Sequence, residues 1–213
     1  VPGVRFAIHH RSRSRAGGDL YEATRLDEHT VGFWVADPGD PGTATGGMIG
    51  LALHRAVVGK EIRPDGYRIL PPDEVVGKVN RDLVGVGLDP APLVAFGYGT
   101  LDVRSGRVGV SRGGLPAPVR LPASGPAEPW HGPGPFLGAF EAEFAAQYGQ
   151  LEPGERLILS TDGGVAPGDG PLAASADRHR ERRGQDFADA IARDLIAAAT
   201  DPDDVTVLVV ERE

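Results

Sequence analysis

Hydrophobic residues along this chain fall into short runs that end at turn-forming residues. Several runs alternate apolar and polar positions or are rich in β-branched residues, which is typical of strands. The predicted strands are 4–9, 19–24, 31–36, 93–101, 107–111, 119–121, 157–160 and 205–210. The turn around Asp27 and Glu28 joins the second and third of these into a hairpin, so we expect Asp19 to lie close to the strand that ends at Asp37.

Three other stretches have apolar residues at helical spacing, at 43–58, 74–83 and 185–199. Thr43 is a predicted N-cap of the first helix, and prolines stand at the start of the second. The apolar face of the first helix is predicted to contain Met48, Ile49, Leu51, Ala52, Ala56 and Val57. This order of elements predicts an α+β fold with antiparallel sheets and with helices on the outside.

The remaining stretches are predicted connections. Polar, solvated loops are predicted at residues 59–70 and 165–183, and the first of these loops is also a candidate lid. Residues 123–135 form a Pro/Gly-rich loop, in which Trp130 and His131 favour a surface excursion over a contact with substrate. Residues 136–150 fit either a strand or a short helix.

Length and composition limit the kind of protein. The 213 residues fit a single domain, and the 31 glycines and 19 prolines are spread as turns between apolar runs. A net charge of −8 argues against a nucleic-acid-binding protein. The chain contains no cysteine, which excludes disulfides and zinc-thiolate sites. Because it also lacks a signal peptide and an apolar run of membrane-spanning length, we expect a cytoplasmic protein without a membrane segment.

Carboxylates at the ends of three predicted strands are the candidate chemistry. Asp37 ends the run 31–36, Asp162 follows 157–160, and Asp204 precedes 205–210. Oxygen ligands without cysteine favour a hard divalent cation such as Mg²⁺ or Mn²⁺. The alternative is that these residues only form turns, since Asp-Gly and Asp-Pro pairs are common turn formers. Prolines and glycines at 38–42 predict a tight loop that holds Asp37 in place, and Asp40 in this loop is either an added ligand or a solvent-exposed residue.

Four segments in a fixed order carry a resemblance to a known family. They are Gly17-Gly18-Asp19, Val35-Ala36-Asp37, Ser160-Thr161-Asp162-Gly163 and Asp203-Asp204-Val205-Thr206, with further agreement at 72–83, 101–106, 112–118 and 151–155. The sequence resembles the SpoIIE/RsbU branch of the PPM-type (protein phosphatase 2C-like) metal-dependent protein serine/threonine phosphatases. The resemblance covers nearly the whole chain.

This resemblance implies a four-layer α/β/β/α sandwich of two antiparallel sheets flanked by helices, formed by one domain over residues 1–213 that follows an N-terminal sensor or regulatory region. It implies two Mn²⁺ or Mg²⁺ ions and hydrolysis of phosphoserine or phosphothreonine by a metal-activated water. The implied metal-site residues are Asp19, Asp37, Pro38 through its backbone carbonyl, Asp162 and Asp204. The implied partner is a phosphorylated STAS-domain anti-anti-sigma regulator, and a homodimer stays open.

The sequence departs from the family pattern at three places. The loop at 36–42 has Asp40 and Pro41 where the family usually has glycine and histidine or lysine, the first motif ends in Glu22 in place of aspartate, and Leu115 stands where the family has histidine. The principal carboxylates are retained. The alternative function is therefore a catalytically degenerate domain that binds a partner or a signal.

Overall fold

Two antiparallel sheets form the centre of the protein. The computed structural model describes residues 1–12, 18–39, 44–132, 134–163, 170–200 and 203–213. The strands of the first sheet, in spatial order, are β1 (Val4–Arg11), β12 (Val205–Arg212), β11 (Arg156–Ser160), β8 (Val119–Leu121) and β9 (Glu128–Pro129). The strands of the second sheet are β10 (Ala146–Gln150), β7 (Arg107–Gly113), β6 (Ala95–Asp102), β3 (Thr30–Asp37) and β2 (Leu20–Arg25).

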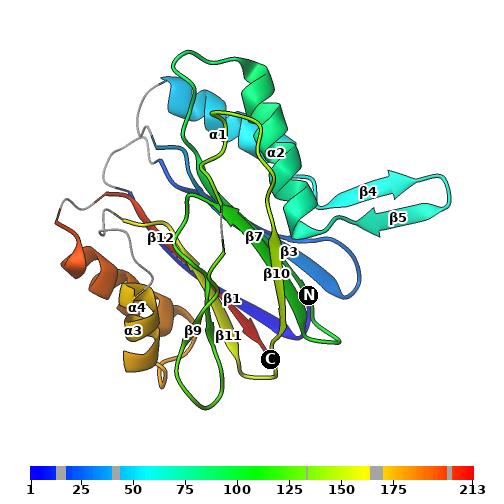
Figure 1. Cartoon of the computed structure of the whole chain (residues 1–213). Helices are drawn as coiled ribbons and strands as arrows, with labels where there is room; N and C mark the ends of the chain where they lie inside the picture. Colours follow the sequence, from blue (N-terminus) through cyan, green and yellow to red (C-terminus); the bar gives the residue numbers. More distant parts are fainter. Residues whose placement is uncertain (13–17, 40–43, 133, 164–169, 201–202) are drawn as a thin grey trace.

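Helices cover the outer face of each sheet (Figure 1). The helices α1 (Ala44–Ala56) and α2 (Pro72–Val86) pack on the second sheet, and α3 (Gly170–Arg178) and α4 (Gly184–Ala198) pack on the first. The result is the four-layer α/β/β/α sandwich that the resemblance implies, so the predicted fold class is confirmed.

Three hydrophobic layers hold the four layers of structure together. Between the two sheets lie β-branched and aromatic side chains such as Phe33, Val35 and Val210. One outer layer joins α4 to the first sheet through Phe187 and Ile191. The other joins α1 and α2 to the second sheet, where Trp34 and Phe96 are fully buried. Because both faces of each sheet are buried, the central strands are apolar almost throughout instead of alternating.

The predicted helices at 74–83 and 185–199 are confirmed as α2 and α4, and the spacing of their apolar residues explains why they form. In α2, Val75, Val79 and Leu83 fall on one face at helical spacing and are buried, and Pro72 stands at the first turn, where a missing N–H costs nothing. The helix ends at Gly87, which adopts the left-handed conformation with φ 67°. In α4, the predicted apolar positions are the buried ones.

The predicted loop and lid at 59–70 is wrong. This segment forms a hairpin of β4 (Lys60–Arg63) and β5 (Gly66–Ile69), which projects from the side of the molecule (Figure 1). Lys60 Nζ donates to the Leu26 carbonyl at 2.8 Å, and the Tyr67 hydroxyl contacts Asp27 at 3.2 Å. Both contacts are to the turn between β2 and β3, at the opposite end of that hairpin from Asp37. The segment therefore does not cover the carboxylates.

Three further expectations need correction. The predicted loop at 165–183 contains α3, a helix with a short apolar face that is joined to α4 by a hydrogen bond of 2.8 Å from Ser175 Oγ to Asp194. On α1, Met48 and Leu51 are 59% and 64% exposed, so the buried face is narrower than predicted and includes Leu53 instead. The predicted loop at 123–135 contains the short strand β9. The stretch 136–150, which fits either a strand or a short helix in sequence, ends in the strand β10. The N-cap Thr43 lies outside the described residues.

Candidate metal centre

The hairpin of β2 and β3 brings Asp19 beside Asp37. Leu20 pairs with Ala36 in the antiparallel register, so the residues just outside this pair, Asp19 and Asp37, face each other at the same sheet end. Asp19 is only 5% exposed, and Asp37 is half-buried. This agrees with the placement that the sequence predicts.

The loop after β3 fixes the Asp37 side chain. The Gly39 N–H donates to Asp37 Oδ1 at 2.7 Å, a local turn that the aspartate closes with its own backbone. Gly39 has φ 69°, and a Cβ there would lie 2.9 Å from the Leu93 carbonyl oxygen, so a glycine is needed. Pro38 between them is buried. Asp40 lies outside the described residues.

The ends of β11 and β12 bring Asp162 beside the acids at 203 and 204. The pairing of these strands continues beyond Ser160, because the Thr161 N–H donates to the Thr206 carbonyl at 3.0 Å. The Asp203 N–H then reaches the Gly163 carbonyl at 3.3 Å. The end of β11 and the start of β12 therefore lie at the same end of the first sheet, which places Asp162 near Asp203 and Asp204.

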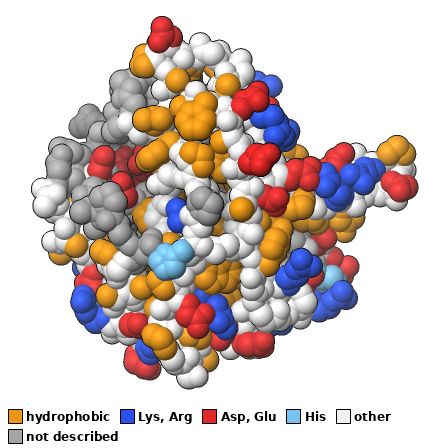
Figure 2. Space-filling view, viewed as in Figure 1, with side chains coloured by type: hydrophobic (Ala, Val, Ile, Leu, Met, Phe, Trp, Pro, Cys, Tyr) orange, Lys and Arg blue, Asp and Glu red, His pale blue; other side chains and the backbone are white. Residues whose placement is uncertain are grey.

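Asp204 connects this region to the first motif. It is 5% exposed, and its Oδ2 accepts a hydrogen bond from the Gly18 N–H, although the two residues are 186 positions apart. The contact holds the segment before β2 against the start of β12. Acids from both sheets consequently meet at one edge of the sandwich, and Figure 2 shows acidic side chains gathered on the side where β12 begins in Figure 1.

Two threonines orient the Asp19 carboxylate. Thr161 Oγ1 and Thr206 Oγ1 each donate to Asp19 Oδ2 at 2.8 Å. His10 Nδ1 lies 3.0 Å from Thr206 Oγ1, and its N–H donates when that nitrogen carries the proton. The other carboxylate oxygen, Asp19 Oδ1, is buried and has no hydrogen-bond partner among the residues that the structure describes. A buried oxygen without a partner is costly unless a further ligand satisfies it.

Burial and mutual repulsion raise the pKa of both carboxylic acids on the second sheet. Burial raises the pKa of Asp19 to about 7, and the charges of Asp37 and Asp204 add to this, while the two threonine hydrogen bonds oppose it. Burial also raises the pKa of Asp37, with the Gly39 hydrogen bond opposing and the charges at 162, 203 and 204 contributing. The site is therefore a concentrated negative charge that a cation would relieve.

The structure brings together four of the predicted carboxylates, Asp19, Asp37, Asp162 and Asp204, with Pro38 beside them. Sequence reasoning missed Asp203, whose charge also acts on Asp37, although its place in a cluster of acids was a signal. It also missed the threonines and His10. Within the described residues, no three His, Cys, Asp or Glu side chains are arranged so that together they could hold a metal ion. The unpartnered Asp19 oxygen and the purely oxygen donor set still fit a hard divalent cation, which commonly keeps several of its waters.

Two of the departures from the family pattern have structural explanations. Glu22 faces α1, where its Oε2 accepts from Trp34 Nε1 at 3.3 Å and lies 3.5 Å from His54 Nδ1, so it points away from the acids. Leu115 is 4% exposed and packs in the layer between the sheets. A leucine there contributes to the core.

A four-layer sandwich with acids from both sheets gathered at one edge defines the class of fold seen in PP2C-type phosphatase domains. The family model for stage II sporulation protein E (SpoIIE) matches residues 29–213. The chain belongs to the SpoIIE family. Comparison with functionally curated proteins finds no significant match.

Three solved structures illustrate the similarity in fold. The RsbU and RsbW domains of a Mycobacterium tuberculosis protein match with TM-score 0.75 and 23% identity, over 100% of this chain and 61% of that one. RsbX in complex with magnesium matches with TM-score 0.73 and 13% identity, over 100% and 97%. The catalytic domain of the serine/threonine protein phosphatase PstP with two manganese ions matches with TM-score 0.69 and 15% identity, over 98% and 97%. At these identities the likeness concerns the fold.

None of the helices described in this chain is long and apolar enough to cross a membrane.

Proposed function

We propose that this domain hydrolyses phosphoserine or phosphothreonine in a protein substrate, using two divalent cations held at the edge where the sheets meet. The observation that carries the proposal is the set of desolvated carboxylates from both sheets, in which a buried oxygen of Asp19 has no hydrogen-bond partner within the described part of the chain. Family membership supports the same reaction. The ligands would be Asp19, Asp37, Asp162 and Asp204, together with the backbone carbonyl of Pro38.

The ions would be Mn²⁺ or Mg²⁺. Carboxylate and carbonyl oxygens suit both ions, and the structural relatives RsbX and PstP are described with magnesium and with two manganese ions. When bound, such ions supply a water of lowered pKa and stabilise charge on the transferring phosphoryl group. The described residues of this chain would hold and orient the ions. Asp37 is held by the Gly39 N–H and Asp19 by two threonines.

The substrate we infer is a phosphorylated STAS-domain regulator. Membership of the SpoIIE family and the similarity to a protein with RsbU and RsbW domains support it. This chain spans 61% of the length of the chain in that mycobacterial structure. We also propose that residues 1–213 form a single domain and that an N-terminal sensor region controls it.

The competing function is a partner-binding domain without catalysis. One observation favours it: no three His, Cys, Asp or Glu side chains among the described residues are arranged so that they could hold a metal ion. The rewritten loop after Asp37 points in the same direction. The two functions differ in whether the protein turns over a phosphate ester at all.

The test is hydrolysis of p-nitrophenyl phosphate and of a phosphorylated STAS protein, with Mn²⁺ and with EDTA. We expect turnover with Mn²⁺ and its loss in EDTA, and Asp37→Asn should remove most of it because one ligand is lost. Arg107→Gln, a charge change at the other end of the second sheet, is the control. Absence of turnover at any Mn²⁺ concentration would favour the partner-binding function, and turnover that is indifferent to EDTA would contradict the metal-dependent reaction.

A further inference from the structure

An exposed histidine is joined to the candidate metal centre by a chain of hydrogen bonds. His10 of β1 pairs directly with Thr206 of β12, and its Nδ1 lies 3.0 Å from Thr206 Oγ1. Thr206 is fully buried, and its hydroxyl lies 2.8 Å from Asp19 Oδ2. Two hydrogen bonds therefore connect the surface of the protein with a buried carboxylate that the proposed function assigns to a cation.

Strand alternation directs His9 and His10 to opposite faces of the first sheet. Ile8 packs in the layer between the sheets, and His10, two residues further on, lies on the same face. His9 faces α4, where its Nδ1 lies 2.9 Å from Asp189 Oδ1. The His10 ring contacts the Tyr21 ring of β2, with the ring centroids 5.5 Å apart. His10 therefore bridges the edge strands of the two sheets, at the end of the strands where the acids gather.

The number of hydrogens in this chain links the His10 ring to the direction of the Thr206 hydroxyl. A threonine hydroxyl has one hydrogen and can donate to one partner only. If His10 carries a hydrogen on Nδ1, it donates to Thr206, and the hydroxyl hydrogen is directed to Asp19. If Nδ1 has no hydrogen, the ring nitrogen is an acceptor and competes with Asp19 for the hydroxyl hydrogen. A hydrogen on Nδ1 therefore commits the hydroxyl to Asp19.

The second threonine does not depend on a ring nitrogen. Thr161 Oγ1 accepts from the backbone N–H of Thr206 at 2.9 Å and lies 2.8 Å from Asp19 Oδ2. Because a backbone N–H can only donate, the Thr161 hydroxyl keeps its own hydrogen for the carboxylate. The fold itself fixes this arm of the network. The Thr206 arm, in contrast, depends on a side chain that is either a donor or an acceptor.

We propose that His10 is a positioning residue of the metal site, whose Nδ1–H holds the Thr206 hydroxyl as a donor to Asp19. Hydrogen bonds to the charged form of a carboxylate favour that form, which is the form that binds a cation. An outer contact that orients a ligand also strengthens metal binding. His10 acts through Thr206 and is not itself a ligand. This inference rests on the proposed function, since that function assigns Asp19 to the cation.

Two uncharged replacements of His10 separate its donor from its ring. His10→Asn places an amide N–H near the position of Nδ1, whereas His10→Phe keeps a ring beside Tyr21 but has no donor. In calorimetric titrations with Mn²⁺, the dissociation constant should rise about threefold to tenfold for the Phe variant and stay within about twofold of the wild type for the Asn variant. His29→Phe, in the turn between β2 and β3, is the control and should bind Mn²⁺ as the wild type does.

A double variant tests whether His10 acts through Thr206. His10→Phe should have no further effect in a Thr206→Val background, because the hydroxyl that His10 directs is then missing. A histidine that merely supports the sheet edge would weaken Mn²⁺ binding by the same factor in both backgrounds. That result, or equal dissociation constants for the Phe variant, the Asn variant and the wild type, would overturn the proposal. Equal weakening by Phe and Asn would overturn it as well.

The position of the hydrogen on the His10 ring gives a readout that needs no metal. Long-range ¹H–¹⁵N correlation NMR of the metal-free protein distinguishes Nδ1–H from Nε2–H. The spectra are recorded at pH 9, where Asp19, with a pKa of about 7, is ionised. We expect Nδ1–H in the wild type and Nε2–H in Thr206→Val, where the acceptor is lost.

The two measurements separate this inference from the proposed function. If the wild type binds Mn²⁺ but carries the hydrogen on Nε2, the role of His10 is overturned and the proposed function stands. If the wild type binds no Mn²⁺, the proposed function fails. An Nδ1–H that moves in Thr206→Val would then still support the hydrogen-bond chain, and an Nε2–H in the wild type would overturn it.

Discussion

Thr206 Oγ1 donates a 2.8 Å hydrogen bond to Asp19 Oδ2 across 187 positions of sequence. Thr161 donates to the same oxygen, and His10 lies within hydrogen-bond distance of Thr206. The C-terminal strands of the first sheet therefore orient a carboxylate that the second sheet supplies. One oxygen is held by the protein, and the other is left for a ligand.

Removing the Thr206 hydroxyl should weaken cation binding. In Thr206→Val the side chain keeps its shape, but Asp19 loses one of the two hydrogen bonds that hold it and that favour its ionised form. We expect the Mn²⁺ dissociation constant to rise roughly tenfold, as is typical when an outer contact of a ligand is lost. Titration calorimetry measures this. Thr206→Ser, which keeps the hydroxyl, is the control, and equal affinities for Val and wild type would contradict the role of this contact.

The stability of the metal-free protein should depend on pH through Asp19. Its pKa is raised from 3.8 to about 7 in the folded state, so folding takes up a proton between these values and the folded protein loses stability as the pH rises through this range. In Asp19→Asn the side chain at position 19 cannot ionise, so this fall in the stability of the folded protein does not occur. In EDTA, the variant should gain on the wild type by on the order of 1.4 kcal/mol per pH unit across the range and should show no gain below about pH 4.

Denaturant unfolding at a series of pH values, with both proteins in the same buffers, gives this difference directly. A constant difference between pH 4 and pH 7 would show that Asp19 is ionised throughout and that its burial has little effect. An Asp65→Asn variant, at an exposed residue in the turn of the β4–β5 hairpin, controls for the general loss of one negative charge.

Gly163 should not tolerate a side chain. It has φ 61°, and a Cβ would lie 2.5 Å from Val205 Cγ2, so Gly163→Ala combines backbone strain with a clash at the start of β12. Gly154 also has a positive φ, 84°, but a Cβ there meets nothing within 4 Å. We expect Gly154→Ala to cost about 1 kcal/mol and Gly163→Ala about 2 kcal/mol or more. The Gly163 variant should also lose Mn²⁺ affinity, because Asp162 precedes it, and equal effects of the two substitutions would contradict the packing argument.

Restoring the family histidine at position 115 should destabilise this protein. Leu115 is buried between the sheets, so Leu115→His places a polar ring in an apolar layer, at a cost of about 2 kcal/mol or more. Leu115→Met, which nearly conserves volume, should cost less than about 1.5 kcal/mol. Denaturant unfolding compares the three proteins. A histidine variant as stable as the wild type would show that the ring reaches solvent at this position.

Strong periodicity made much of the fold predictable. The helices α2 and α4 and the central strands have apolar residues at clear spacing, and the hairpin turn at Asp27 correctly placed Asp19 beside Asp37. Elements with little buried surface were not predictable in this way. The helix α3 buries few side chains, and the β4–β5 hairpin consists mostly of exposed polar residues, so neither has a recognisable pattern.

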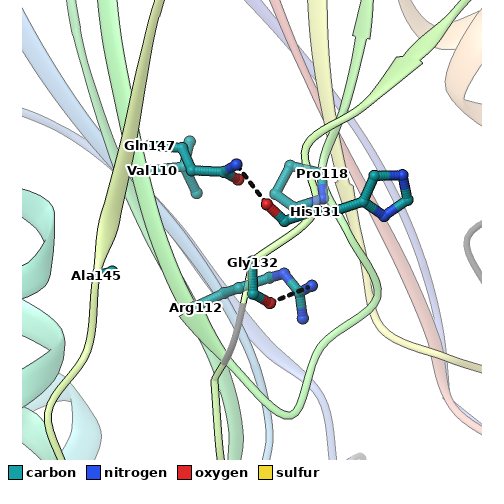
Figure 3. Close-up of a pocket in the computed structure, with 7 residues that line it drawn as sticks. All are labelled: Val110, Arg112, Pro118, His131, Gly132, Ala145 and Gln147. Atoms are coloured by element: carbon teal, nitrogen blue, oxygen red, sulfur yellow. Dashed lines mark hydrogen bonds between the residues drawn. The ribbon is translucent and has the colours of Figure 1, made fainter.

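The acids of the site were predictable as strand ends, but their surroundings were not. The contacts of Asp19 with Thr161 and Thr206 join residues far apart in sequence, and only the pairing of β11 with β12 brings the two threonines together. The hydrogen bond from Arg112 on β7 to the Gly132 carbonyl after β9 likewise joins segments that belong to different sheets (Figure 3). Contacts between residues so far apart leave no pattern in the local sequence from which they could be predicted.

The account depends most directly on the claim that the clustered carboxylates hold divalent cations. Calorimetric titration of the metal-free protein with Mn²⁺ tests it, beside Asp37→Asn and the control Arg107→Gln. We predict two bound ions per chain for the wild type and for Arg107→Gln, with at least tenfold weaker binding or fewer ions for Asp37→Asn. Absence of Mn²⁺ binding by the wild type, or equal binding by Asp37→Asn, would contradict the account.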